Sequence, residues 1–149
     1  MFEVTVPFHR EFMYRVWKCL ESKNHPGASI VKDETTGAGI DAVGKSPNSF
    51  FVGGECPSLE VHPGEVLAVP RRGGGFPVIL VSSAVEHWLE YNGNNNGILG
   101  VWWDSRTDTA VLDRSTDVSG LDTAITLGRV RGESDIWDAT NGCCIPVSG

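Results

Sequence analysis

The sequence has few charged residues, no long apolar run and no recognisable catalytic motif. Only 21% of its residues are charged, and its apolar runs are far shorter than the ~20 residues that a membrane-spanning helix requires. We therefore expect a soluble chain that does not act at a membrane. No serine lies in a nucleophile-elbow pattern, and no other residues have the arrangement of a catalytic centre. The sequence favours a structural or binding role, with no small-molecule substrate, over an enzyme.

The four cysteines form neither a disulfide framework nor a metal-binding motif. Cys143 and Cys144 are adjacent, and neighbouring cysteines rarely bond to each other. Cys19 and Cys56 stand alone, so we expect reduced thiols. The histidines are scattered, at positions 9, 25, 62 and 87, without the close Cys/His spacing of a zinc site. We expect no metal and no cofactor.

Basic residues are outnumbered by acidic ones. The chain has 12 Lys and Arg against 19 Asp and Glu, a net charge of −7 at pH 7, and the acidic excess lies after residue 45. An acidic surface repels phosphate backbones, so we expect no nucleic-acid partner. Arg71 and Arg72 form the only basic doublet and precede three glycines, which is typical of a solvated turn.

Five aspartates are spaced roughly evenly along the second half of the chain, at positions 104, 108, 113, 117 and 122. They lack the central glycine and the terminal glutamate of a calcium-binding loop. We interpret them as turn residues and a solvated acidic face. A weak cation site where two of these turns meet stays open as an alternative.

Glycine and proline are abundant, with 18 and 8 residues among 149. Both disfavour helix interiors, so we predict a mainly β fold, a small, turn-rich barrel or sandwich. The length fits a single domain over residues 1–149. We place the β core at residues 59–128 and one α-helix at residues 8–22. That helix has an apolar stripe at helical spacing: Phe8, Phe12, Met13, Val16, Trp17 and Leu20.

Residues 97–113 are the most apolar and aromatic part of the chain. Two apolar runs, 98–103 and 110–112, flank the polar segment 104–108, which predicts two strands joined by a turn that begins at Asp104. Trp102 and Trp103 are adjacent, so they point to opposite faces of their strand. One can fill the core while the other anchors self-association, or the second is covered by the chain's own loops.

Shorter patterns predict the remaining elements. Strands are expected at 30–31, 50–52, 59–61, 66–69, 76–81, 85–91 and 124–127, and turns at 62–65, 71–75 and 92–97. Phe2, Val4 and Val6 alternate with polar residues and predict an extended arm over residues 1–7. Such an arm adds a strand to a partner's sheet or pairs within its own domain. The short apolar pieces 136–137 and 145–147 have no assigned place.

Residues 39–46, Gly-Ile-Asp-Ala-Val-Gly-Lys-Ser, match the literal phosphate-loop pattern. That motif should follow a buried strand and open a helix. Here a glycine-containing polar segment precedes it, and Pro47 with an apolar run follows it. We therefore treat a nucleotide-binding enzyme that uses residues 39–46 as the least favoured alternative.

Residues 59–121 resemble the lambda-type head decoration proteins of tailed bacteriophages. The similarity lies in the order of six signals, namely His-Pro-Gly-Glu-Val-Leu at 62–67, Asn-Gly at 92–93, Gly-Ile-Leu-Gly-Val at 97–101, the acidic turn 104–108, Ala-Val-Leu at 110–112 and Val-Ser-Gly-Leu at 118–121. It covers less than half of the chain, and residues 8–22 and those beyond 128 have no counterpart in it.

The resemblance implies a protein of the virion exterior, assembled in the host cytoplasm, that binds the major capsid protein and stabilises the shell as a homotrimer. Within this expectation, Phe2, Val4 and Val6 would bind the capsid, and Trp102 and Trp103 would mediate self-association. A virion connector such as a tail-terminator subunit, which also pairs an amphipathic helix with a sheet, stays open as an alternative.

Overall fold

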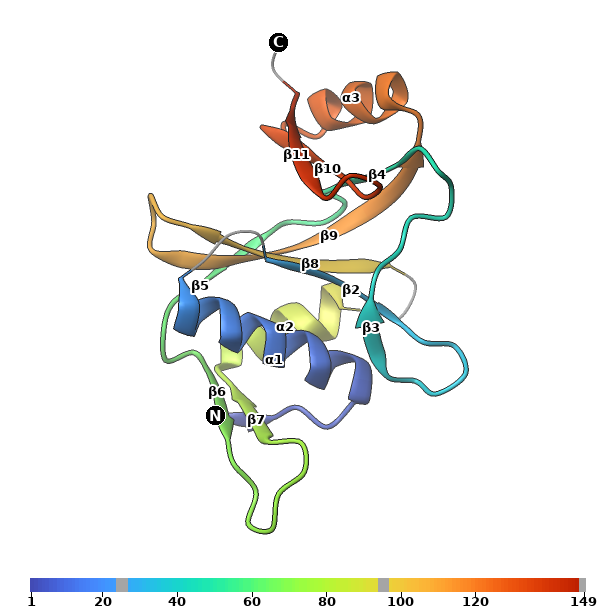
Figure 1. The fold of residues 1–149 in the computed structure, drawn as a ribbon. Helices are drawn as coiled ribbons and strands as arrows, with labels where there is room; N and C mark the ends of the chain where they lie inside the picture. The colour runs from blue at the N-terminus through green and yellow to red at the C-terminus, as the bar shows by residue number, and fades with distance from the viewer. Residues whose placement is uncertain (24–26, 94–96, 148–149) are drawn as a thin grey trace.

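The computed structural model describes residues 1–23, 27–93 and 97–147 (Figure 1). It confirms a mainly β fold with an N-terminal helix, and it adds two further helices. The predicted turn at 92–97 lies partly outside the described residues. The strands are β1 (Phe2–Glu3), β2 (Ala28–Lys32), β3 (Gly39–Asp41), β4 (Ser49–Val52), β5 (Leu59–Val61), β6 (Val66–Val69), β7 (Val78–Val81), β8 (Ile98–Asp104), β9 (Thr109–Ser119), β10 (Asp135–Asp138) and β11 (Cys143–Pro146).

The predicted hairpin at residues 97–113 is the centre of the larger sheet. Its strands, β8 and β9, pair antiparallel from Ile98 opposite Ser115 to Asp104 opposite Thr109. The turn between them begins as predicted, because the Asp104 carboxylate accepts a hydrogen bond from the Arg106 backbone N–H at 3.0 Å. The sheet order is β11-β10-β4-β9-β8-β2-β3, with β5 also paired to β9.

Strand β9 changes partner along its length. Its first part, through Leu112, pairs with β5, and its last part, from Thr116, pairs with β4. Between these parts the chain after β4 runs beside β9, and the Glu55 N–H donates to the Arg114 carbonyl. This change of partner divides the sheet into a main body and a C-terminal lobe, which appears above the main body in Figure 1.

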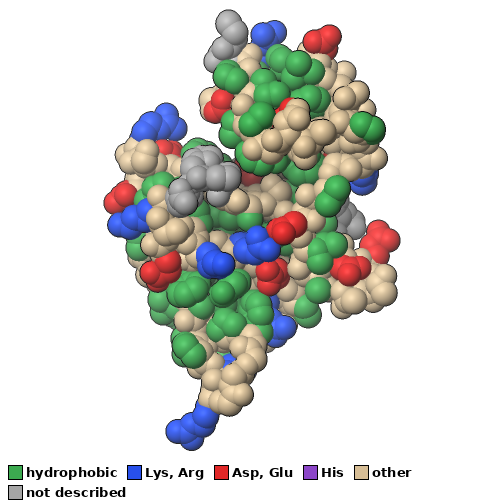
Figure 2. Space-filling model, in the orientation of Figure 1, with side chains coloured by type: hydrophobic (Ala, Val, Ile, Leu, Met, Phe, Trp, Pro, Cys, Tyr) green, Lys and Arg blue, Asp and Glu red, His purple; other side chains and the backbone are tan. Residues whose placement is uncertain are grey.

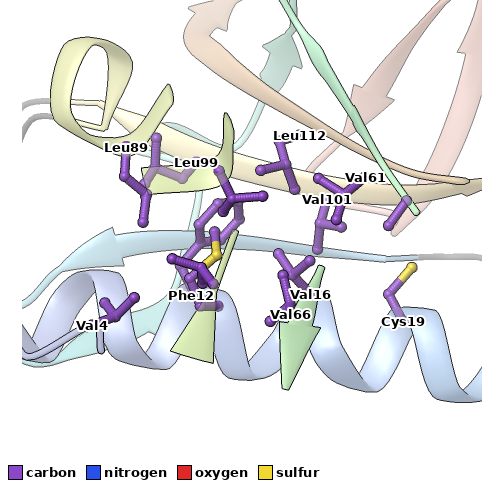
Figure 3. Packing of buried hydrophobic residues seen from close by; sticks show 14 of the residues in the cluster. Val4, Phe12, Val16, Cys19, Val61, Val66, Leu89, Leu99, Val101 and Leu112 are labelled. Carbon is purple, nitrogen blue, oxygen red and sulfur yellow. The ribbon is translucent and has the colours of Figure 1, made fainter. Parts of the chain in front are cut away.

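Helix α1 (Pro7–Ser22) confirms the N-terminal helix. Pro7 occupies the first helical turn, where its missing N–H costs nothing. The buried face holds Phe8, Phe12, Met13, Val16, Cys19 and Leu20, and it packs on the β2-β8-β9 part of the sheet and on a small three-stranded sheet, β1-β7-β6. Side chains from α1, β2, β6, β7, β8 and β9, with Val4 and with Val61 of β5, contribute to the main core (Figure 3).

Two of the predicted strands are wrong, because both segments are helices. Residues 85–91 belong to α2 (Ser83–Asn92), and residues 124–127 belong to α3 (Leu121–Val130). In α2 the buried residues are Val85, Trp88 and Leu89. Their three- and four-residue spacing is that of a helix face, although the same segment also alternates in polarity.

The C-terminal lobe has a small core of its own. It contains Phe50, Val52, Ala124, Ile136 and Val147, contributed by α3, β4, β10 and the chain after β11. Residues 136–137 and 145–147, unplaced by sequence, thus belong to or follow the β10-β11 hairpin. Helix α3 approaches closely at Gly128, where a Cβ would lie 3.0 Å from Val147. None of the described helices is long and apolar enough to cross a membrane.

Candidate functional site

A cleft separates the C-terminal lobe from the β8-β9 hairpin. It consists of two hollows, of about 630 and 450 Å³. Trp102, Asp113 and Glu133 line both hollows, so the hollows meet at these three side chains. In Figure 2 the C-terminal lobe stands apart from the main body at the level of this cleft.

The floor of the cleft is the face of the β8-β9 hairpin that points away from the main core. Residues Leu99, Val101 and Trp103 belong to that core. Because side chains alternate along a strand, the intervening Gly100 and Trp102 face the cleft. Asp113 lies directly opposite Gly100 and therefore shares this face, which places a carboxyl group in the middle of the floor.

Two glycines leave room for the Asp113 carboxyl group. A Cβ on Gly100 would collide with its Oδ1, and a Cβ on Gly53 would lie 2.7 Å from its Oδ2. The same Gly53 position lies 2.5 Å from Glu133 Oε1. Asp113 Oδ2 and Glu133 Oε1 therefore lie on either side of this Cβ position and are no more than about 5 Å apart. At this distance the charge of each carboxyl group affects the pKa of the other.

Among the described residues, neither the Asp113 nor the Glu133 carboxyl group accepts a hydrogen bond, and only the positive charge of Arg131 favours the ionised form of Glu133. The oxygens of both groups are open to the cleft. Burial, and then the charge of Glu133, raise the pKa of Asp113 to about 7. Burial also raises the pKa of Glu133, although Arg131 opposes this rise. A half-buried carboxyl pair with raised pKa values is typical of functional sites.

The guanidinium groups around the cleft are already engaged elsewhere. Arg131 donates to the carbonyls of Val52 and Gly53 at 3.0 and 3.2 Å and to Thr116 Oγ1 at 3.0 Å. In the larger hollow, Arg15 pairs with Asp41 at 3.0 Å and with Glu11 at 3.1 Å.

Arg106, also in the larger hollow, pairs with Asp104 at 3.2 Å. In both hollows the acidic lining residues outnumber the basic ones. The cleft therefore has a surplus of negative charge centred on Asp113 and Glu133.

The two tryptophans predicted for self-association lie on opposite faces of β8, as their adjacency requires. Trp103 is buried in the main core, whereas Trp102 is half-buried and lines both hollows. Trp137, on β10, also lines the larger hollow. The cleft thus combines carboxyl groups with indole rings. Whether Trp102 mediates self-association stays a prediction.

The predicted N-terminal arm pairs within its own chain. Phe2 lies opposite Val81 in the small sheet, and the Val4 N–H donates to the Ile79 carbonyl at 2.9 Å. Val4 is buried in the main core. Phe2 and Val6 stay 44% and 47% exposed, so these two, unlike Val4, present apolar surface to solvent, and whether they bind a capsid stays a prediction.

The segment that matches the phosphate-loop pattern does not have that motif's structure. It begins as the short strand β3, and the next element is the strand β4, so no helix starts after Lys45. The Lys45 N–H donates to Asp117 Oδ2 at 2.9 Å. A phosphate group at this N–H would lie beside the Asp117 carboxylate, which would repel it. The backbone cradle that binds phosphate is therefore missing here.

The interpretation of the aspartates as turn residues and a solvated face is wrong for Asp113. Asp113 and Asp117 lie within β9, and Asp113 is enclosed in the cleft floor. Among the described residues, no group of three or more His, Cys, Asp or Glu side chains is arranged to hold a metal ion. His25 lies outside them.

Sequence reasoning missed the cleft and its carboxyl pair. One signal was present, because Asp113 directly follows an apolar run in a strand, where a charged residue is unusual. Glu133 had no such signal, since it lies in a polar loop. Comparison of the chain with protein-family models, curated proteins and solved structures finds no match.

Proposed function

We propose that the chain is a non-catalytic protein-binding module whose cleft binds an arginine side chain of a partner. The observation that carries the proposal is the pair of neighbouring carboxyl groups, Asp113 and Glu133, which no described residue satisfies with a hydrogen bond. A guanidinium group donates several hydrogen bonds in one plane and so matches two adjacent carboxylates.

The surroundings of the pair favour a cation over other ligands. Acidic residues predominate along the cleft, and the whole chain carries a net charge of −7. Trp102 lies beside the pair, and an indole face attracts a guanidinium group. An anionic or nucleic-acid ligand would be repelled by the same groups.

The direct test is peptide binding by titration calorimetry. A Gly-Gly-Arg-Gly-Gly peptide and the same peptide with citrulline, the uncharged analogue of arginine, form a matched pair. Because a charge-assisted hydrogen bond contributes ~1.5–3 kcal/mol, we expect the wild-type chain at pH 8 to bind the arginine peptide at least tenfold more tightly.

Variants then assign the binding to the carboxyl pair. The double variant Asp113→Asn/Glu133→Gln should lose the preference for arginine, whereas Asp108→Asn, in the exposed β8-β9 turn, should keep it. Equal affinity for the two peptides in the wild-type chain, or no binding of either, would refute the proposal.

A second candidate function, capsid decoration, is favoured by a different surface. Large apolar side chains stay exposed on and beside the small sheet. Leu67 (39%) and Val69 (43%) share its outer face. Phe2 (44%), on the edge strand β1, and Val6 (47%), just before α1, are also exposed. Exposed apolar patches on small proteins are typical of protein interfaces. In this proposal the chain binds the major capsid protein on the outside of the assembled shell, as the sequence resemblance implies.

Quantitative mass spectrometry of purified virions tests this second candidate. A shell-covering protein should be present in a copy number comparable to that of the major capsid protein, whereas a tail terminator should be present as one ring per particle. Absence of the chain from virions would reject both. Recombinant Phe2→Asp/Leu67→Asp protein should then fail to sediment with shells that bind the wild-type chain.

A further inference from the structure

The β6–β7 connection, residues 70–77, forms a thin basic projection, named here the basic finger. Residues Gly73, Gly74 and Gly75 all have positive φ, of 88°, 91° and 89°, and a Cβ on any of them would meet no atom within 4 Å. The tip is therefore exposed backbone with little side-chain bulk. In Figure 2, blue Lys and Arg side chains mark this end of the molecule.

The two arginines of the basic finger have different roles. Arg71 is tied back, because its Nε donates to the Phe76 carbonyl at 2.8 Å and its guanidinium lies 3.8 Å from the Glu3 carboxylate. Arg72 is exposed and forms no hydrogen bond or ion pair with a described residue. Its guanidinium group is thus presented to a partner on a narrow support.

We infer that the basic finger of one copy binds the cleft of a second copy, with Arg72 between the carboxyl groups of Asp113 and Glu133. The finger supplies the cation that the cleft requires, and the cleft supplies the carboxylates that Arg72 lacks. The main core separates finger and cleft within one chain (Figure 1), so this contact joins different copies. The inference rests on the proposed arginine-binding function.

The contact has a consequence for assembly. Finger and cleft are different surfaces, so each copy can bind one neighbour through its cleft and another through its finger. Such head-to-tail contacts form a closed ring or an open chain. The smallest closed form is a dimer in which each finger binds the other copy's cleft, and the predicted homotrimer is the next larger ring. The contact also buries Trp102, which lies beside the carboxyl pair.

Complementation between variants tests the inference, with mass measured by sedimentation velocity at pH 8. Wild-type protein should self-associate with increasing concentration. Arg72→Glu, which loses the finger, and Asp113→Asn/Glu133→Gln, which loses the cleft, should each stay monomeric. A mixture of the two variants should form heterodimers and nothing larger, because only one intact finger and one intact cleft can meet. Lys45→Glu, an equal charge change at another exposed site, should assemble like the wild type.

A monomeric wild type, wild-type-like assembly of Arg72→Glu, or absence of heterodimers in the mixture would overturn the inference. Far-ultraviolet circular dichroism of each variant excludes unfolding as the cause of a lost contact. The peptide titration separates the two proposals. If the wild-type chain prefers the arginine peptide but Arg72→Glu assembles normally, the partner of the cleft is another protein and the binding function stands.

Discussion

The chemical character of Asp113 comes from its neighbours across the sheet. Two glycines, Gly53 and Gly100, leave space for its carboxyl group, and Glu133 adds a second negative charge beside it. These neighbours come from three other segments of the chain, so no local pattern in the sequence could show the pair. An aspartate on an ordinary exposed turn would instead be solvated and would keep its usual pKa.

We predict that Asp113→Asn stabilises the chain at neutral and alkaline pH. The pKa of this carboxyl rises from 3.8 to about 7 on folding, so the wild-type chain loses stability as the pH rises from about 4 to about 7 and no further above it. Asparagine removes this loss. The gain in the free energy of unfolding should approach, at most, something on the order of 4 kcal/mol above pH 7.

Urea unfolding at pH 4, 6 and 8 measures this effect. The difference between Asp113→Asn and the wild type should be small at pH 4 and should grow through pH 6 to pH 8. Asp108→Asn should show no such trend, because Asp108 lies on the exposed turn. A difference that is independent of pH would show that the carboxyl does not titrate near neutrality.

At the level of elements, the sequence predicted long or strongly patterned segments well. Helix α1 and the β8-β9 hairpin were confirmed, because each has one dominant periodicity. The sequence pattern predicted a strand at α2, because its residues fit both the two-residue period of a strand and the spacing of a helix face. The prediction used the alternation of Val85, His87, Leu89 and Tyr91. The decisive signal was the serine before the helix, a residue that favours the N-cap position.

We predict that Ser82→Ala destabilises α2 and its link to the β5–β6 turn. Ser82 Oγ accepts a hydrogen bond from the Val85 N–H at 3.3 Å and donates one to Glu65 Oε1 at 3.0 Å. Loss of the N-cap alone costs about 1 kcal/mol. Thermal or urea unfolding should therefore show a loss of about 1–2 kcal/mol.

Ser83→Ala is the matched control for this change. Ser83 is the next residue, is exposed and is already inside the helix, where alanine is the better helix former. The control should be neutral or slightly stabilising. A comparable loss in both variants would mean that Ser82 does not act as the cap.

For the whole molecule, the sequence predicted the fold class but not the division into two bodies. Glycine, proline and alternating apolar residues were enough to indicate a mainly β protein. The cleft arises because β9 pairs with β5 at one end and with β4 at the other. This depends on contacts between segments far apart in the chain, which a local pattern does not encode.

The separate cores predict that the C-terminal lobe can open without unfolding the main body. Ile136 is 2% exposed and belongs only to the small core, so Ile136→Ala should lower stability by about 2–5 kcal/mol. In native-state hydrogen exchange, amides of α3, β10 and β11 should lose protection while those of α1 keep it, because local opening follows contiguous packed units. Leu99→Ala, in the main core, should lower protection in α1 as well. If Ile136→Ala exposes α1 and α3 equally, the two cores unfold as one unit and the cleft cannot widen by movement of the lobe.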